Sequence, residues 1–474
     1  MPGPTSTPNF HPSLILHGGA GNIQRSTLPP ALYEKYHISL LTYLRSTSSL
    51  LSNGATALDA AVHAVSLMED DELFNCGRGS VFTEAGEIEM EASVMVSSVI
   101  EREEGDNGGE GEKKRGAGVM MVRNVRHPIQ LAREVLVRTG DDGAEDGGSM
   151  HCQLSGEYVE SCARSWGLEF QPDSYFWTKR RWDEHLRGLN GEKELVTMSQ
   201  GTVGCVCLDR YGGLAVATST GGLTNKKPGR IGDTPTLGAG FWAESWAEDR
   251  VVSGLATEEN TLSLGGDSGW SVRGAWNMTK TLWGDCLSST PLSTGSERVS
   301  TNATQYSPQI PCHSELPPPY TLTWNPDLAV RQTYRRAVAM SGTGNGDSFL
   351  RVAAARTAAA MSRFSSSSEA PFSLSSAVTS VAGPGGELQR SSGSRWGKTG
   401  EGEGGIIGIE AELPLPTGKE NNACSGDVSG GKLRKGKVVF DFNCGGMYRA
   451  WMEDDPDRPG KERERVMVFR DEYV

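Results

Sequence analysis

The segment Gly201–Asp209, GTVGCVCLD, constrains this chain more than any other, because a glycine and a threonine lead directly into a strand-like run. A threonine hydroxyl is a poor nucleophile, but a threonine at a chain end carries its own base, the free α-amine. The pKa of such an amine, about 7.7–8.0, leaves a useful fraction neutral near pH 7. Since Thr202 lies in mid-chain, cleavage of the Gly201–Thr202 bond would create that base. Taken alone, the same residues also suit the start of an ordinary strand.

Two polar segments follow this run. Thr218–Gly222, TSTGG, is a hydroxyl-rich turn, and residues 229–233, GRIGD, place Arg230 and Asp233 among glycines. A guanidinium fork binds a carboxylate through two hydrogen bonds, and a carboxylate three residues on can receive an ammonium group. The pair therefore predicts a clamp for a small zwitterion. The alternative interpretation is a surface ion pair, which contributes about 0–1 kcal/mol.

Three more segments carry unusual patterns. LILHGGAG (14–21) predicts a buried strand entering a glycine loop, LFNCGRGS (73–80) precedes EMEASVM (89–95), and SGTGNGD (341–347) precedes an alanine-rich helix. With the Thr202 block, these segments resemble, in order and content, the plant-type L-asparaginase/isoaspartyl peptidase family, whose members are N-terminal-nucleophile (Ntn) threonine hydrolases. The resemblance covers roughly half of the chain, in blocks from His17 to Gly446.

The resemblance implies an α+β fold, a four-layer αββα sandwich of the Ntn-hydrolase type. Short alternating strands flanked by helices suit this arrangement, but periodicity alone does not fix it. Residues 1–201 would form the α-subunit portion of a single domain, and residues 202–474 the β-subunit portion. Long irregular inserts are expected at 101–115, at about 248–325 and at about 365–435, with 365–405 disordered because it is rich in serine and glycine.

Several elements are expected from local patterns. Helices are predicted at 31–44, after an N-cap at Thr56, at 129–137 and at 348–361. Strands are predicted at 202–208 and 214–218, joined by a turn at 211–213. Another strand, at 438–442, is expected to close the fold.

The resemblance also assigns roles to individual residues. The expected catalytic residues are the nucleophile, two residues beside it and two that form an oxyanion hole: Thr202, then Thr220 and Asn75, then Thr343 and Gly344. The backbone N–H groups before a helix suit an oxyanion. The substrate would be held by Arg230, Asp233 and the carbonyl of Gly346. For Thr220 and Asn75 the alternative is an ordinary turn role.

The implied activity is hydrolysis of L-asparagine to L-aspartate and ammonia, and of β-aspartyl (isoaspartyl) peptides, after self-cleavage between Gly201 and Thr202. No cofactor or catalytic metal is expected. The loop from Glu69 to Arg78 resembles one that holds a structural sodium ion through backbone carbonyls in some relatives. The expected assembly is a dimer of αβ heterodimers. Two positions depart from the family pattern, with Glu91 in place of aspartate and Asp347 in place of glutamate.

Other functions are less well supported by the sequence. The glycine loop at 18–21 does not complete a dinucleotide fingerprint, because Gln24 occupies the last position, and the loop at 341–347 lacks the Lys-Ser/Thr of a phosphate-binding loop. Glycosylasparaginases usually have asparagine where this chain has Gly221, and taspase-type endopeptidases differ around TSTGG and GRIGD. An uncleaved, inactive scaffold is the remaining alternative.

Composition restricts the partners. The formal net charge of −13 over 474 residues disfavours nucleic-acid binding, and no apolar run is long enough to span a bilayer. The N-terminal residues lack the pattern of a signal peptide. Cys205 and Cys207 alternate along the predicted strand, so we expect core thiols in a reducing, cytoplasmic compartment rather than a metal site.

Overall fold

The structure, a computed structural model, describes residues 9–26, 28–100, 115–138, 151–191, 201–253, 329–365, 371–415 and 433–473. Nearly all of them belong to one compact unit, formed by residues 1–252 and 331–474. The other unit, residues 253–330, lies almost entirely outside the described residues. Most of the inserts predicted at 101–115 and 248–325 therefore fall outside them, as do residues 416–432.

The larger sheet has eight strands among the described residues, in the order β14-β13-β2-β6-β7-β3-β4-β5. Neighbouring strands are antiparallel, except for the parallel pair β4 and β5. The strands are β2 (Ser13–Gly21), β3 (Met90–Ser98), β4 (Arg115–Val122), β5 (Gln153–Ser155), β6 (Val203–Leu208), β7 (Gly213–Thr220), β13 (Gly446–Asp454) and β14 (Glu462–Met467).

A second sheet has four strands, in the order β12-β10-β9-β8. They are β8 (Phe241–Ser253), β9 (Ala329–Gly344), β10 (Gly404–Pro414) and β12 (Lys437–Phe442). Strand β10 pairs antiparallel with both β9 and β12. A short parallel pair joins β1 (Phe10–His11) to β11 (Arg434–Lys435).

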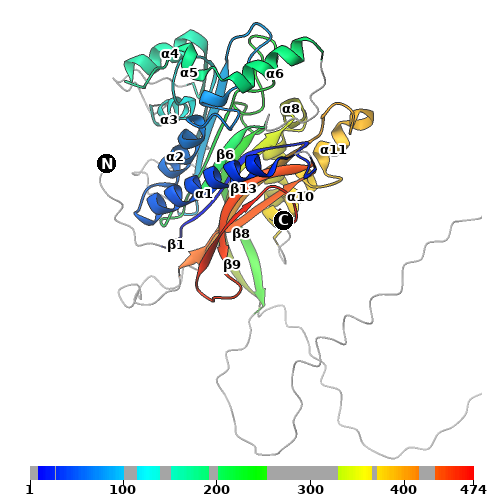
Figure 1. The fold of residues 1–474 in the computed structure, drawn as a ribbon. Helices are drawn as coiled ribbons and strands as arrows, with labels where there is room; N and C mark the ends of the chain where they lie inside the picture. The colour runs from blue at the N-terminus through cyan, green and yellow to red at the C-terminus, as the bar shows by residue number, and fades with distance from the viewer. Residues whose placement is uncertain are drawn as a thin grey trace, which may run out of the picture. The chain divides into compact units, whose positions relative to one another are not determined.

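The helices divide between the two sheets (Figure 1). On the larger sheet lie α1 (Pro30–Ser52), α2 (Ala57–Glu69), α3 (Pro128–Arg138) and α4 (Gly156–Ser165), with α5 (Asp173–Phe176) and α6 (Lys179–Leu189) near them. The smaller sheet carries α10 (Leu374–Ala382), which packs with α9 (Ala354–Phe364) and α11 (Glu387–Ser391). Helix α8 (Gly346–Val352) packs with α9 and α11.

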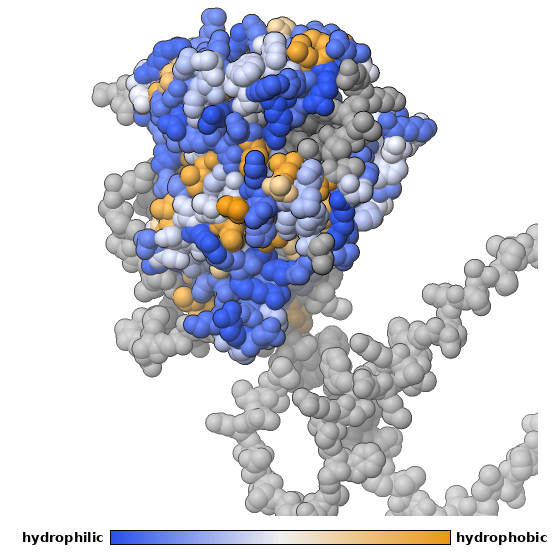
Figure 2. Space-filling model, viewed as in Figure 1, coloured by the Kyte–Doolittle hydropathy of each residue, from blue (hydrophilic) through white to orange (hydrophobic). Residues whose placement is uncertain are grey.

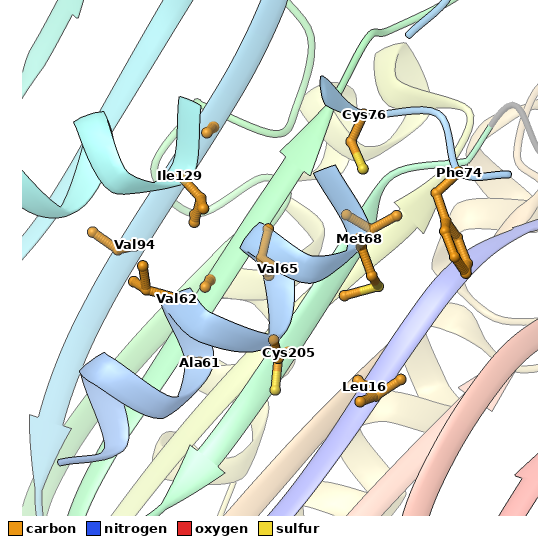
Figure 3. Close-up of a cluster of buried hydrophobic side chains, with 14 of the residues drawn as sticks. Leu16, Ala61, Val62, Val65, Met68, Phe74, Cys76, Val94, Ile129 and Cys205 are labelled. Carbon is orange, nitrogen blue, oxygen red and sulfur yellow. The ribbon is translucent and has the colours of Figure 1, made fainter. Parts of the chain in front are cut away.

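Three hydrophobic clusters hold these elements together. Figure 3 shows part of the first, where Val62, Val65 and Met68 of α2 lie over Leu16 of β2 and Cys205 of β6. The second cluster fills the space between the sheets, and the third lies between the smaller sheet and its helices. Because successive side chains of a strand point to opposite faces of the sheet, one strand can contribute residues to two clusters.

Strand β6 illustrates this alternation. Cys205 and Cys207 face the helices, as expected of core thiols, while Val206 and Leu208 face the second sheet. Burial raises the pKa of the Cys207 thiol well above its usual range. The predicted turn to β7 is confirmed: Asp209 accepts hydrogen bonds from the backbone N–H groups of Tyr211 and Gly213.

Most predicted helices and strands form close to their expected bounds, including α2 after its N-cap Thr56, whose hydroxyl accepts from the Asp59 N–H. Two expectations near the C-terminus were wrong. The helix predicted at 348–361 is interrupted at Ala353, whose φ is 44°. The strand at 438–442 does not close the fold, because β13 and β14 follow it and extend the larger sheet.

The disorder predicted for residues 365–405 was also wrong over most of that range. Residues 371–402 contain α10 and α11, and β10 begins at Gly404. Leu374, Val378 and Val381 of α10 are fully buried in the third cluster. The serine-rich composition misled the prediction because the serines occupy one face of α10 while the apolar residues share the other.

The visible surface is mostly hydrophilic, with hydrophobic residues gathered across its middle (Figure 2). Among the described helices, none has both the length and the apolar character needed to cross a membrane.

Because α10 buries one face in the third cluster, residues 371–402 should contribute to the stability of the fold. Leu374→Ala should lower the free energy of unfolding by about 2–5 kcal/mol, because it leaves a cavity in a packed cluster. Ser380→Ala, on the polar side of the same helix, should change it by less than about 0.5 kcal/mol. Urea unfolding of both variants measures the difference. Equal stability of the two would show that α10 is dispensable.

Candidate functional site

The Gly201–Thr202 bond lies at a close approach of three segments. Gly201 stands just before β6, beside the end of β2 and the end of β9. A Cβ atom on Gly201 would come within 2.6 Å of the Ala20 nitrogen and of the Thr343 hydroxyl, and within 2.7 Å of the Gly19 Cα. Real side chains do not tolerate such contacts, so this position requires glycine. The structure thus brings the predicted cleavage site to the predicted oxyanion residue Thr343.

The nucleophile candidate is enclosed. Thr202 is 5% exposed, and its hydroxyl shares a hydrogen bond of 3.0 Å with the hydroxyl of Thr234. Sequence reasoning missed Thr234, although it directly follows the clamp residue Asp233. The position of a hydroxyl next to that aspartate was the available signal. The Thr234 carbonyl accepts a 2.6 Å hydrogen bond from the Ser93 hydroxyl, which fixes this turn against β3.

Thr220 and Asn75 shape one turn, which follows β7, the strand next to β6. Val203 pairs with Ser219 in the sheet, which places Thr220 opposite Thr202. The Thr220 hydroxyl accepts from the Gly222 N–H at 3.0 Å, and the Asn75 amide donates to the Gly222 carbonyl at 2.7 Å. Both side chains are buried. Their bonds hold the glycine turn that follows β7.

His17 is a second residue to which sequence reasoning gave no role. It lies in β2 and is fully buried, with its Nε2 atom 2.7 Å from the Ser341 hydroxyl. Its ring also interacts with the backbone of Thr202. Burial lowers the pKa of His17 to about 3, so the ring is neutral near pH 7. The β2 strand and the start of β6 are therefore linked by a neutral imidazole.

The predicted clamp residues do come together. A Cβ atom on Gly346 would lie 2.5 Å from the Asp233 Oδ1 atom and 2.9 Å from the Arg230 Nη2 atom. The same Nη2 atom donates to Asp347 at 3.2 Å. Arg230, Asp233 and Gly346 thus surround one small space, with the Asp347 carboxylate on its solvent side, 59% exposed.

Of the two charged clamp residues, Arg230 and Asp233, Asp233 has the more unusual environment. Its Oδ2 atom is buried and has no hydrogen-bond partner among the described residues. Burial raises the pKa of its carboxyl to about 7, although nearby Arg230 favours the charged form. A cation placed here would supply the missing partner, as the predicted clamp requires.

Two buried charged side chains, Glu91 and Lys226, lie near Arg230. Glu91 accepts a 2.9 Å hydrogen bond from the Gly232 N–H, and burial raises the pKa of this carboxyl. Lys226 donates to the Glu89 carbonyl at 2.5 Å, and burial lowers the pKa of its ammonium group. The Glu91 carboxylate therefore fixes the turn that carries Arg230 and Asp233.

Thr343 and Gly344 end β9, and Asn345 caps the following helix by accepting from the Ser348 N–H. The Thr343 hydroxyl accepts a 3.2 Å hydrogen bond from the Ala20 N–H. Gly344 has φ of 147°, which disfavours any other residue. These residues were expected just before a helix, and that placement is confirmed.

The loop from Glu69 to Arg78 presents carbonyl oxygens rather than a cage of carboxylates. A Cβ atom on Gly77 would lie 2.2 Å from the Glu69 carbonyl oxygen, and one on Gly79 would lie 2.0 Å from that of Phe74. The Glu72 carbonyl instead accepts from Arg180. In the described part of the chain, no three His, Cys, Asp or Glu side chains gather as metal ligands.

The structure thus places the buried Thr202 directly after the tightly packed Gly201, and Thr234 links it to the turn that carries Asp233. A family model described as asparaginase matches residues 10–248. The chain therefore belongs to the asparaginase family, which confirms the resemblance seen in the sequence.

Individual proteins with names of this family are also similar to this chain. A Dictyostelium discoideum protein provisionally named isoaspartyl peptidase/L-asparaginase is 37% identical over 52% of this chain and 74% of its own length. The isoaspartyl peptidase/L-asparaginase of Danio rerio is 37% identical over 49% of this chain and 67% of its own length. The isoaspartyl peptidase of Salmonella typhimurium is 36% identical, over 49% and 69% respectively.

The buried Asp233 predicts a pH-dependent cost to stability. Its pKa is about 7 in the folded chain and about 4 in an unfolded one, so the folded state loses stability as pH rises from 4 to 7. Asp233→Asn should therefore raise the free energy of unfolding above pH 7, by at most a few kcal/mol, and the gain should vanish as pH falls toward 4.

This comparison is made by urea unfolding in a Thr202→Ala background, so that both proteins are single chains. Asp347→Asn, which changes an exposed carboxylate of the same site, is the control. A gain from Asp233→Asn that is constant with pH would mean that the carboxyl is not penalised by burial.

Proposed function

We propose that this protein cleaves its own chain between Gly201 and Thr202 and then uses Thr202 to hydrolyse L-asparagine and β-aspartyl peptides. The observation that carries the proposal is the packing of Gly201 against Gly19, Ala20 and Thr343, with Thr234 bonded to the Thr202 hydroxyl. This arrangement holds the scissile carbonyl beside a nucleophile inside the fold.

Self-cleavage would begin at the Thr202 hydroxyl. Its oxygen attacks the Gly201 carbonyl carbon, and the bond to the Thr202 nitrogen breaks as that nitrogen takes up a proton. The resulting ester is hydrolysed by water, which leaves a Gly201 carboxylate and a free Thr202 α-amine. The Thr234 hydroxyl lies 3.0 Å from the reacting oxygen and would orient it.

In the cleaved enzyme the α-amine of Thr202 serves as the base. It takes the proton of the hydroxyl, whose oxygen attacks the side-chain carbonyl of the substrate. The Thr343 hydroxyl and the Gly344 N–H stabilise the oxyanion. Ammonia or a peptide amine leaves with a proton, and water then hydrolyses the β-aspartyl ester to release aspartate and restore Thr202.

The clamp decides which carbonyl reaches Thr202. Arg230 takes the α-carboxylate of the aspartyl unit, displacing Asp347, while Asp233 and the Gly346 carbonyl take its α-amine. Thr220 and Asn75 hold the glycine turn beside the nucleophile. Names of relatives that join isoaspartyl peptidase and L-asparaginase support both substrates.

The remaining features of the family complete the proposal. They comprise the four-layer αββα arrangement of Ntn hydrolases, subunit portions 1–201 and 202–474, and a dimer of αβ heterodimers. The packing of helices on both sheets supports the first of these. The Glu69 and Phe74 carbonyls would hold a structural sodium ion. The free thiols among the described cysteines suit the cytoplasm.

Thr202→Ala should remain one chain and be inactive toward L-asparagine, because it lacks the attacking hydroxyl. Thr202→Ser, which keeps a hydroxyl, should still give two fragments. A denaturing gel and N-terminal sequencing measure the result, and the smaller fragment should begin Thr-Val-Gly-Cys in the wild type. An active, uncleaved wild-type protein would contradict the mechanism, and a stable, inactive single chain would favour a scaffold.

Arg230→Lys should lower kcat/KM for L-asparagine roughly tenfold to more than a hundredfold, because it keeps the charge and loses the planar fork. A charge-assisted bidentate bond contributes about 1.5–3 kcal/mol. Self-cleavage should be much less affected, since Gly201 offers no free α-carboxylate, so its time course is the internal control. Unchanged hydrolysis would show that Arg230 is not the anchor, and failed cleavage would show that it holds the fold.

A further inference from the structure

An ion pair between Arg230 and Asp347 lies at the edge of the clamp. The Arg230 Nη2 atom donates to the Oδ1 atom of Asp347 at 3.2 Å. Among the residues that the structure describes, Asp347 is the one acidic side chain that reaches hydrogen-bonding distance of this guanidinium. The two residues are 117 positions apart in the chain, so tertiary packing rather than a local turn brings them together. The anchor proposed for the substrate carboxylate therefore already holds a carboxylate of the chain itself.

This contact falls on the accessible end of the guanidinium. A Cβ atom on Gly232 would lie 2.7 Å from the Arg230 Nη1 atom, and one on Gly222 would lie 3.5 Å from it, so the backbone covers that end. The Nη2 atom instead meets Asp347, whose side chain is 59% exposed, whereas that of Arg230 is 17% exposed. A ligand that comes from solvent therefore reaches Arg230 on the side where Asp347 lies.

The position of Asp347 interferes with the binding of a second carboxylate. A guanidinium offers two planar forks, Nε with Nη2 and Nη1 with Nη2, and both forks include Nη2. A substrate carboxylate held by two hydrogen bonds would thus lie next to the Asp347 carboxylate, and two negative charges at such a distance repel each other. Binding of the substrate therefore requires that Asp347 leave Arg230.

The ion pair is weak enough for this exchange. Asp347 makes a single hydrogen bond to Arg230, and no other hydrogen bond or ion pair holds its carboxylate within the described residues. Exposed ion pairs of this kind contribute little to stability, because holding two long side chains together opposes a modest attraction in water. The pair therefore opens and closes readily, and Arg230 is available to a ligand for part of the time.

From these contacts we propose that Asp347 is an internal competitor of the substrate α-carboxylate at Arg230, which raises KM and leaves the chemical step unchanged. This role rests on the function proposed above, in which Arg230 anchors every substrate through its α-carboxylate. The apparent affinity for a ligand falls with the fraction of time that its site is available. Because the exchange of carboxylates precedes the attack by Thr202, Asp347 affects KM and not kcat.

Asp347→Asn tests this role, because it removes the competing charge and keeps the size of the side chain. The cleaved variant should have a KM for L-asparagine roughly two- to fivefold below that of the wild type. This range is expected if the pair occupies Arg230 for about half to four-fifths of the time. The inhibition constant of L-aspartate, which carries the same α-carboxylate, should fall by the same factor, while kcat stays within about twofold.

Two details of the measurement separate this effect from others. Steady-state assays near pH 8 keep the Asp233 carboxyl, whose pKa is about 7, mostly charged in every variant. Asp347→Ser, which also removes the carboxylate, should behave as Asp347→Asn does, and a denaturing gel should show that both variants are cleaved.

Glu84→Gln is the matched control. Glu84 is another partly exposed carboxylate, but it pairs with Lys227 at 2.6 Å. Lys227 lies three residues before Arg230, so this control removes the same charge from the same neighbourhood without releasing Arg230. Its KM for L-asparagine and its inhibition constant for L-aspartate should stay close to the wild-type values.

Each other result has a distinct meaning. An unchanged KM in both Asp347 variants would overturn the competitor role while leaving the proposed function intact. A raised KM would show that Asp347 helps to bind the substrate, and a matching fall in Glu84→Gln would assign the effect to net charge; either result also overturns the role. Failure of both Asp347 variants to cleave themselves would show that Asp347 holds the fold instead. If cleaved wild-type protein does not hydrolyse L-asparagine, the proposed function fails, and this role fails with it.

Discussion

The close approach at Gly201 is the constraint on which the rest of the site depends. A glycine at the start of β6 lies against Gly19 and Ala20 of β2 and against the Thr343 hydroxyl of β9. Strands from both sheets must therefore be in place before the Gly201–Thr202 bond can be held. The core between the sheets, rather than any single loop, therefore positions Thr202.

The electrostatics of the site follow from its burial. Carboxylates at Glu91 and Asp233 and the ammonium group of Lys226 all have pKa values displaced toward their neutral forms. In their charged forms such groups are stabilised by neighbours of opposite charge. The fold keeps Arg230 among carboxylates, and the Asp233 Oδ2 atom has no hydrogen-bond partner among the described residues, which suits the cationic group that the proposed function requires.

The segment 343–346 contacts different parts of the chain at its two ends. The Gly346 end lies beside Arg230 and Asp233, and the Gly344 end lies against the backbone of Glu403 and Gly404. Because both ends belong to the same strand–helix junction, a shift of this junction would move Gly344 and Gly346 together.

The sequence by itself determined the family, the strands β6 and β7 and the N-cap at Thr56, because these depend on local patterns and short motifs. It also singled out Arg230, Asp233 and Gly346, which the structure brings together. It misjudged α10, since composition does not reveal that buried side chains share one face. It did not assign roles to Thr234 or His17. Their contacts join residues far apart in the chain, and only the packing of the two sheets decided which hydroxyl and which ring would lie beside Thr202.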